Sequence, residues 1–182
     1  MSEFSNNKTV FTLSTGKVNL YSLVMIFPVT AIYLIPYILV WDFASFEIGR
    51  KEFMNLFIYI LIFGIIIHEL LHGITWAFFT KKGFKSIKFG INGITPYCHC
   101  KEALMAKHYR LGGAMPLIIM GIIPSIVGII LGDGLYLSFG IFFSWAACGD
   151  IISLFMLRKY NGNKLVFDHP DKMGFYVEGS NL

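Results

Sequence analysis

Four long apolar stretches, separated by short polar segments, set the pattern of this chain. They cover residues 20–41, 53–80, 109–131 and 135–157. An α-helix needs about 20 predominantly apolar residues to cross a bilayer, so each stretch is long enough to span one. The pattern predicts an all-α membrane protein with four transmembrane helices, organised as a single domain over residues 1–182.

The polar segments predict how the spans are joined. Residues 42–52 are charged and short, which indicates a loop between the first two spans. After the second span, two apolar-rich runs flank the turn residues Gly90–Gly93, and this arrangement predicts a β-hairpin. Residues 158–182 form a short polar C-terminal tail, in which Leu165–Phe167 and Phe175–Val177 can pair as short strands.

Composition supports the membrane class. Hydrophobic residues make up 55% of the chain and charged residues 14%, well below the ~25% charged residues of typical soluble proteins. The mean hydropathy is +0.65. The formal net charge of +4 comes from basic residues in the segments that flank the spans. It therefore carries information about topology and does not indicate a nucleic-acid partner.

The basic residues predict the orientation. Thirteen of the fifteen Lys and Arg residues lie in the N-terminal tail, the 81–110 region and the C-terminal tail, whereas residues 42–52 hold two. Cytoplasmic segments of membrane proteins are enriched in Lys and Arg. We therefore expect an integral protein of a bacterial cytoplasmic membrane, with the hairpin and both termini in the cytosol and the lipid bilayer as a constant partner.

The second span contains the pattern His68-Glu69-Leu70-Leu71-His72. Residues four apart lie on the same face of a helix, so His68 and His72 can offer two nitrogens to one Zn²⁺. The His-Glu-x-x-His pattern is the signature of zinc peptidases, in which the Glu acts as general base. Ionisable groups deep in an apolar span are expensive and generally functional, which favours a metal site.

Asp150 is the only formally charged residue of the fourth span. It lies fifteen residues after Leu135, just as His68 lies fifteen after Phe53. The second and fourth spans run in the same direction, so at 1.5 Å per residue both groups reach a depth of roughly 22 Å. A buried carboxylate needs a cation, and we predict Asp150 as the third metal ligand. Pairing with another polar group of the bundle is the alternative.

Cys98-His99-Cys100 admits two interpretations. The three residues could form a metal-binding tract, or they could be ordinary strand residues, with both cysteines on one face and His99 on the other. The spacing favours ordinary strand residues, because structural zinc pairs prefer wider separations. The count of three cysteines, with Cys148 inside an apolar span, does not indicate a disulfide framework.

These features resemble a known group. HELLHG inside an apolar span, a basic hairpin loop, Gly113–Leu117 and Gly149-Asp150 in a later span resemble the site-2 protease type of intramembrane metalloprotease. Over about residues 20–177, including Asp168-His169-Pro170, the layout more closely resembles the small family of putative zincin peptidases, related to site-2 proteases. The resemblance implies Zn²⁺ as cofactor, His68, His72 and Asp150 as its ligands, and Glu69 as the catalytic base. One departure is Ile151, where site-2 proteases usually have Gly after the Asp.

Three functions follow from these residues. The preferred one is an intramembrane zinc metalloendopeptidase that hydrolyses a membrane protein or peptide substrate, with a water activated by Glu69. The second is a membrane metal-binding accessory protein without proteolysis, which does not need Glu69. The third is a structural four-helix membrane protein, with His68, Glu69, His72 and Asp150 paired among themselves. Metal content separates the third from the others, and a Glu69→Gln variant separates the first two.

The predicted orientation can be tested by labelling. A single cysteine placed at Lys88, in a background without the native cysteines, should react with a membrane-impermeant maleimide only after the membrane is opened. A cysteine placed at Lys51 should react in intact cells, because residues 42–52 are expected on the external side. Labelling of position 88 in intact cells would reverse the orientation.

Overall fold

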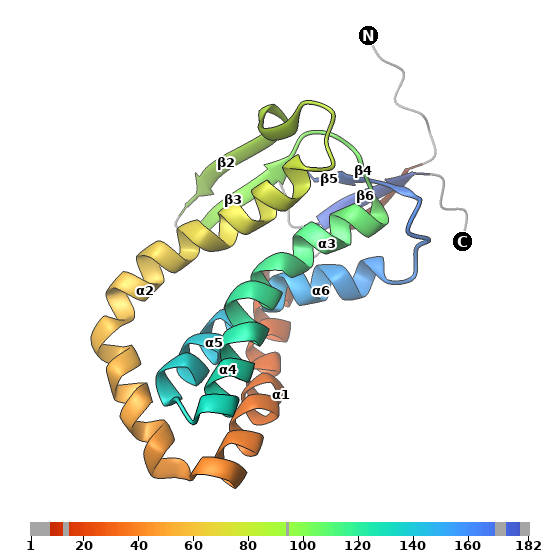
Figure 1. The fold of residues 1–182 in the computed structure, drawn as a ribbon. Helices are drawn as coiled ribbons and strands as arrows, with labels where there is room; N and C mark the ends of the chain where they lie inside the picture. The colour runs from red at the N-terminus through yellow and green to blue at the C-terminus, as the bar shows by residue number, and fades with distance from the viewer. Residues whose placement is uncertain (1–7, 13–14, 94, 170–173, 179–182) are drawn as a thin grey trace.

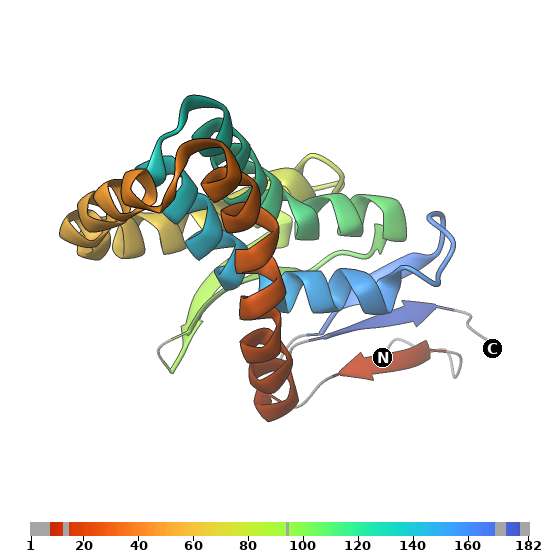
Figure 2. The same cartoon turned by 90° about the horizontal axis from the view of Figure 1, so that it is seen from below.

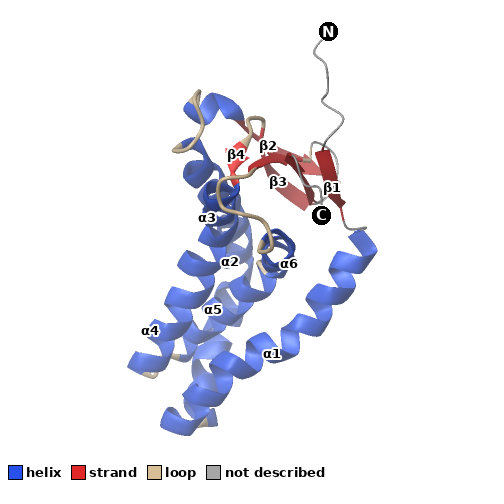
Figure 3. Ribbon diagram, turned by 90° about the vertical axis from the view of Figure 1, so that its right-hand side faces the viewer, coloured by secondary structure: helices blue, strands red, loops and turns tan. Residues whose placement is uncertain are grey.

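The computed structural model describes residues 8–12, 15–93, 95–169 and 174–178 (Figure 1). The chain is mostly helical, and its strands gather at one end of the helices (Figure 3). The helices are α1 Thr15–Trp41, α2 Phe43–Ala77, the short 3-10 helix η1 Gly83–Ser86, α3 Ala106–Pro116, the π-helix η2 Leu117–Ile122, α4 Ile123–Leu131, α5 Gly134–Ala146 and α6 Cys148–Leu157. The strands are β1 Lys8–Thr12, β2 Ile87–Asn92, β3 Thr95–Cys100, β4 Leu104–Met105, β5 Leu165–Asp168 and β6 Gly174–Glu178.

The apolar stretches form the expected long helices. Three helical segments are long and apolar enough to cross a membrane, Gly16–Trp41, Phe43–Ala77 and Ala106–Leu131. Helices α5 and α6 meet the same criterion only together, and they are bent by 52° at the break between them. The fourth predicted span, 135–157, is therefore two helices at an angle, and the bend falls just before Asp150.

The predicted loop at residues 42–52 is wrong, because α2 begins at Phe43. The Asp42 side chain accepts a hydrogen bond of 2.8 Å from the Ser45 backbone N–H and caps the helix. One turn further on, Glu47 and Arg50 form a two-pronged ion pair that helical spacing brings together. The segment contains no proline, so the helix continues through it and its charged side chains lie on the helix surface.

The predicted hairpin is confirmed. Strands β2 and β3 pair antiparallel, with partners running from Ile87↔Cys100 to Asn92↔Thr95. The hairpin lies along the C-terminal half of α2 (Figure 1). Phe89 packs its ring directly over Gly73, one residue after the second histidine of the motif. The sequence that follows the motif thus folds back over it.

The C-terminal tail is more ordered than predicted. The expected pairing inside it is confirmed, since β5 and β6 align Val166 with Val177 and Phe167 with Tyr176. They belong, however, to a four-stranded sheet with the order β1-β6-β5-β4. Strand β1, from the start of the chain, lies beside β6 (Figure 2), and neither β1 nor β4 was expected from the sequence. The buried face of this sheet packs with α3 and α6 through a cluster that includes Leu104, Leu157, Val166, Phe175 and Val177.

The contact between α2 and α5 gives a stability prediction. A Cβ added at Gly49 would lie 2.2 Å from backbone atoms of Gly134 and Leu135, so the two helices could not keep their separation. Gly49→Ala should therefore destabilise the protein by about 2 kcal/mol or more, in the range for overpacked sites. Gly16→Ala is the matched control, because a Cβ there meets nothing within 4 Å. Thermal unfolding in detergent, followed by circular dichroism, would compare the two variants; equal midpoints would contradict the packing.

Candidate metal centre

Helix α2 presents both histidines of the motif to the same side. His68 and His72 are one turn apart, and their ring centroids are separated by 5.0 Å. Their side chains are 12% and 7% exposed, respectively. Two imidazoles therefore face a common point beside one face of a helix whose other residues are largely apolar.

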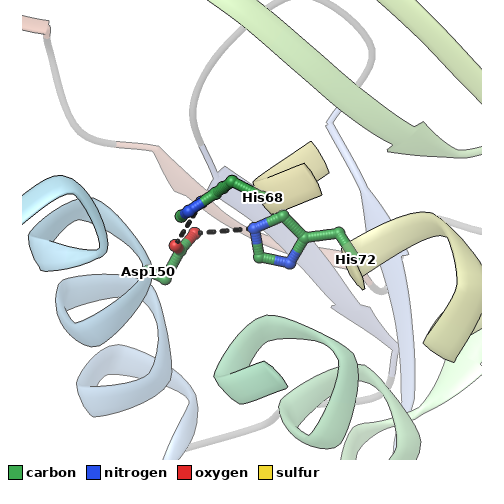
Figure 4. A group of neighbouring side chains, drawn as sticks. All are labelled: His68, His72 and Asp150. Atoms are coloured by element: carbon green, nitrogen blue, oxygen red, sulfur yellow. Dashed lines mark ion pairs between the residues drawn. The ribbon is translucent and has the colours of Figure 1, made fainter. Parts of the chain in front are cut away.

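Asp150 reaches that point from α6 (Figure 4). Its carboxylate oxygens lie 3.2 Å from His68 Nε2 and 3.4 Å from His72 Nε2. The bend after Ala146 places Asp150 in the first turn of α6, so the break in the fourth apolar stretch is what presents this carboxylate. The structure thus brings together the three residues that the sequence singles out as ligands.

The arrangement fits a metal ion of the zinc type. One donor atom from each of the three residues lies within 4.8 Å of the other two, and the described residues contain no second such group. Around a tetrahedral zinc with bonds of about 2.1 Å, neighbouring donors are roughly 3.4 Å apart. The two nitrogen–oxygen separations, 3.2 and 3.4 Å, each to a different oxygen of the carboxylate, are close to that value. Two imidazoles and one carboxylate are also a common donor set of catalytic zinc sites, which keep a further position open.

His72 is held from behind by two contacts. Its Nδ1 lies 2.9 Å from the carbonyl oxygen of Gly112. A carbonyl only accepts, so Nδ1 carries the proton, and in the neutral ring Nε2 keeps a lone pair that can bind a metal ion. The indole of Trp76 stacks on the imidazole with centroids 5.3 Å apart and planes inclined by 17°. Such supports fix the orientation of metal-binding histidines.

Glu69 lies beside this group and faces the hairpin. Its carboxylate interacts electrostatically with His68, His72 and Asp150, and also with the backbone N–H of Cys98 on β3. Burial raises the pKa of the Cys98 thiol, and the neighbouring Glu69 carboxylate raises it further. The glutamate is thus placed between the three candidate ligands and a strand of the hairpin.

The Cys98-His99-Cys100 segment lies on β3 and serves another purpose. Burial raises the pKa of Cys100 to about 11, so its sulfur is a neutral thiol at neutral pH. His99 Nδ1 lies 2.9 Å from Asp168 Oδ2, and Asp168 also accepts hydrogen bonds from Cys100 N and the Tyr109 hydroxyl. Among the residues that the structure places, none of this segment belongs to a metal-binding group, in agreement with the interpretation as strand residues.

A supporting network was not predicted from the sequence. Tyr109 stacks on Trp76 with centroids 5.1 Å apart, and its carbonyl accepts the indole N–H. The contacts therefore run from His72 through Trp76 and Tyr109 to Asp168, which connects β5 to the candidate metal centre. In the sequence these aromatic residues look like ordinary members of apolar spans.

Comparison with known proteins places this site within a family. A family model described as "Putative zincin peptidase" matches residues 61–165. The match covers 105 of the 182 residues, more than half of the chain, and includes both histidines, Glu69 and Asp150. No curated protein and no solved structure matches the chain.

The support of His72 gives a prediction about metal affinity. A Cβ at Gly112 would lie 2.1 Å from Trp76 Nε1, so Gly112→Ala should displace the indole and the carbonyl that hold the imidazole. We expect the affinity for Zn²⁺ to fall by about 10–100-fold, the usual effect of losing such a support. The neighbouring Gly113→Ala is the control, because its Cβ would meet Leu154 only at 3.4 Å. Competition for zinc with a chromogenic chelator measures both variants; equal affinities would show that the Gly112 contacts do not position His72.

Proposed function

The chain belongs to the family described as putative zincin peptidases, and from this membership we propose that it is an intramembrane zinc metallopeptidase acting on membrane-associated proteins or peptides. The observation that carries the proposal is the meeting of His68, His72 and Asp150 from two apolar helices, with Glu69 beside them. A group of this composition at such a depth is costly unless it has a function.

Strand pairing supports a four-span topology. Strands β1, β4, β5 and β6 belong to one sheet, so the segments that carry them lie on one side of the membrane. Helices α1 and α2 separate β1 from β4, and the helices α3 to α6 separate β4 from β5. An even number of crossings must lie in each interval. The requirement is met when α5 and α6 together make one crossing. The basic residues likewise predict that the segments carrying these strands share one side.

Each residue of the centre has a distinct role in the proposal. His68, His72 and Asp150 hold the ion, and the carbonyl of Gly112 keeps His72 oriented. When bound, Zn²⁺ lowers the pKa of a water and polarises the scissile carbonyl. Glu69 accepts the proton of the attacking water and passes it to the leaving amine. Buried surroundings strengthen each of these charge interactions.

The hairpin is suited to hold a substrate strand. A helical substrate presents no free backbone to attack, so it has to unwind before hydrolysis. Strands β2 and β3 form a two-stranded sheet, so each has one edge outside that pairing. An extended peptide can add to such an edge through backbone hydrogen bonds. The contact between Glu69 and Cys98 places β3 next to the proposed base.

A glutamate substitution tests the catalytic role. Glu69→Gln should leave zinc bound, because residue 69 is not a metal ligand. It should abolish hydrolysis, because the amide cannot take up the proton of the attacking water. His72→Ala should lose both metal and activity. Metal content by elemental analysis of protein purified without chelators, together with cleavage of a membrane-tethered substrate in detergent, measures the two effects.

The outcomes also separate the rival functions. Full activity in Glu69→Gln would exclude the general-base role. A metal-binding accessory protein would be favoured if the wild-type protein binds zinc tightly but, like Glu69→Gln, cleaves none of a broad panel of membrane-tethered peptides. Wild-type protein without metal would favour the structural alternative, in which the 3.2 and 3.4 Å contacts are ion pairs between protonated histidines and Asp150.

A further inference from the structure

A group of basic side chains lies where α3 begins and α6 ends. Backbone hydrogen bonds hold the two segments together, from Ala106 N to the Lys164 carbonyl at 2.8 Å and from Lys107 N to the Gly162 carbonyl at 3.0 Å. The guanidinium of Arg110 donates to the carbonyl of Tyr160 across the same junction. We call this group the basic corner; its members are Lys107, Arg110, Arg158, Lys159 and Lys164.

Three charges of the basic corner have no carboxylate partner among the described residues. In the part of the chain that the structure describes, Lys107, Arg110 and Arg158 form no ion pair with a carboxylate. Arg110 is partly buried, its Nε is shielded from solvent without a hydrogen-bond partner, and its one described acceptor is a carbonyl. A partly buried guanidinium with five donors is best satisfied by an anion.

An apolar surface adjoins these charges. Phe155, two residues before the end of α6, is 60% exposed, and Leu111 next to Arg110 is 41% exposed. The guanidinium carbon of Arg158 lies 3.6 Å from the centroid of the Phe155 ring. Cationic groups therefore lie at the start of α3 and the end of α6, beside the exposed hydrophobic side chains of Phe155 and Leu111. A molecule that contacts both the cationic groups and the apolar surface has an anionic head and an apolar tail.

We propose that the basic corner binds the phosphate headgroup of an anionic phospholipid, with its acyl chains against Phe155 and Leu111. The proposal rests on the membrane insertion of the proposed function and not on proteolysis. A soluble anion would use the charges but leave the apolar surface without a partner. Each Lys or Arg near an anionic membrane surface contributes about 1 kcal/mol, which is about fivefold in affinity.

Lipid binding can be measured on the whole purified protein. Native mass spectrometry in detergent would follow titration with phosphatidylglycerol and with phosphatidylcholine of the same acyl chains. We expect the wild type to prefer phosphatidylglycerol, and Lys107→Gln/Arg158→Gln to lose about fivefold in that affinity for each charge removed. Lys81→Gln/Lys82→Gln, which removes two exposed lysines elsewhere, should keep the wild-type affinity.

Further arms identify the ligand and check the fold. Lys107→Arg/Arg158→Lys keeps both charges and should retain binding, which separates charge from folding effects. Excess inorganic phosphate should displace little phosphatidylglycerol, and complete displacement would assign the corner to free phosphate. Equal binding of the two lipids to the wild type, or an equal loss in Lys81→Gln/Lys82→Gln, would overturn the proposal. Neither result bears on Glu69, so the peptidase proposal is tested separately.

Discussion

The dominant constraint on this structure is the desolvation of two imidazoles and a carboxylate inside apolar helices. Removing such groups from water costs several kcal/mol for each ion unless a partner compensates. The chain supplies partners from separate elements, with the histidines on α2, the carboxylate on α6 and a carbonyl on α3. Three helical segments must therefore be packed in the correct positions before the centre is stabilised. The packing of the bundle and the chemistry of the centre depend on the same contacts.

The elements that follow from periodicity could be predicted from the sequence. The long apolar stretches, the hairpin around Gly93 and the pairing of β5 with β6 all appear in the structure. Equal spacing from the span ends also brought Asp150 to the level of His68, although α5 and α6 are bent. That estimate succeeded because a bend at the end of α5 redirects the chain without removing Asp150 from the bundle.

The features that could not be predicted depend on distant contacts. Residues 42–52 look like a charged loop, yet the cap at Asp42 and packing of Gly49 against Gly134 make them helical. Strand β1 is too short to be recognised without its partner β6, which lies more than 160 residues away. Trp76 and Tyr109 have the same apolar character as their neighbours in the spans, so only their stacking identifies them as supports of His72.

The pairing of β1 with β6 also constrains how the protein is made. Lys8 aligns with Glu178 and Thr12 with Gly174, so a strand that precedes all the helices pairs with one that follows them. All the apolar helices lie between these strands and leave the ribosome before β6 does, since a chain emerges from its N-terminus. The sheet can therefore close only after all these helices have been synthesised. Until then, the edge of β1 that pairs with β6 has no partner strand.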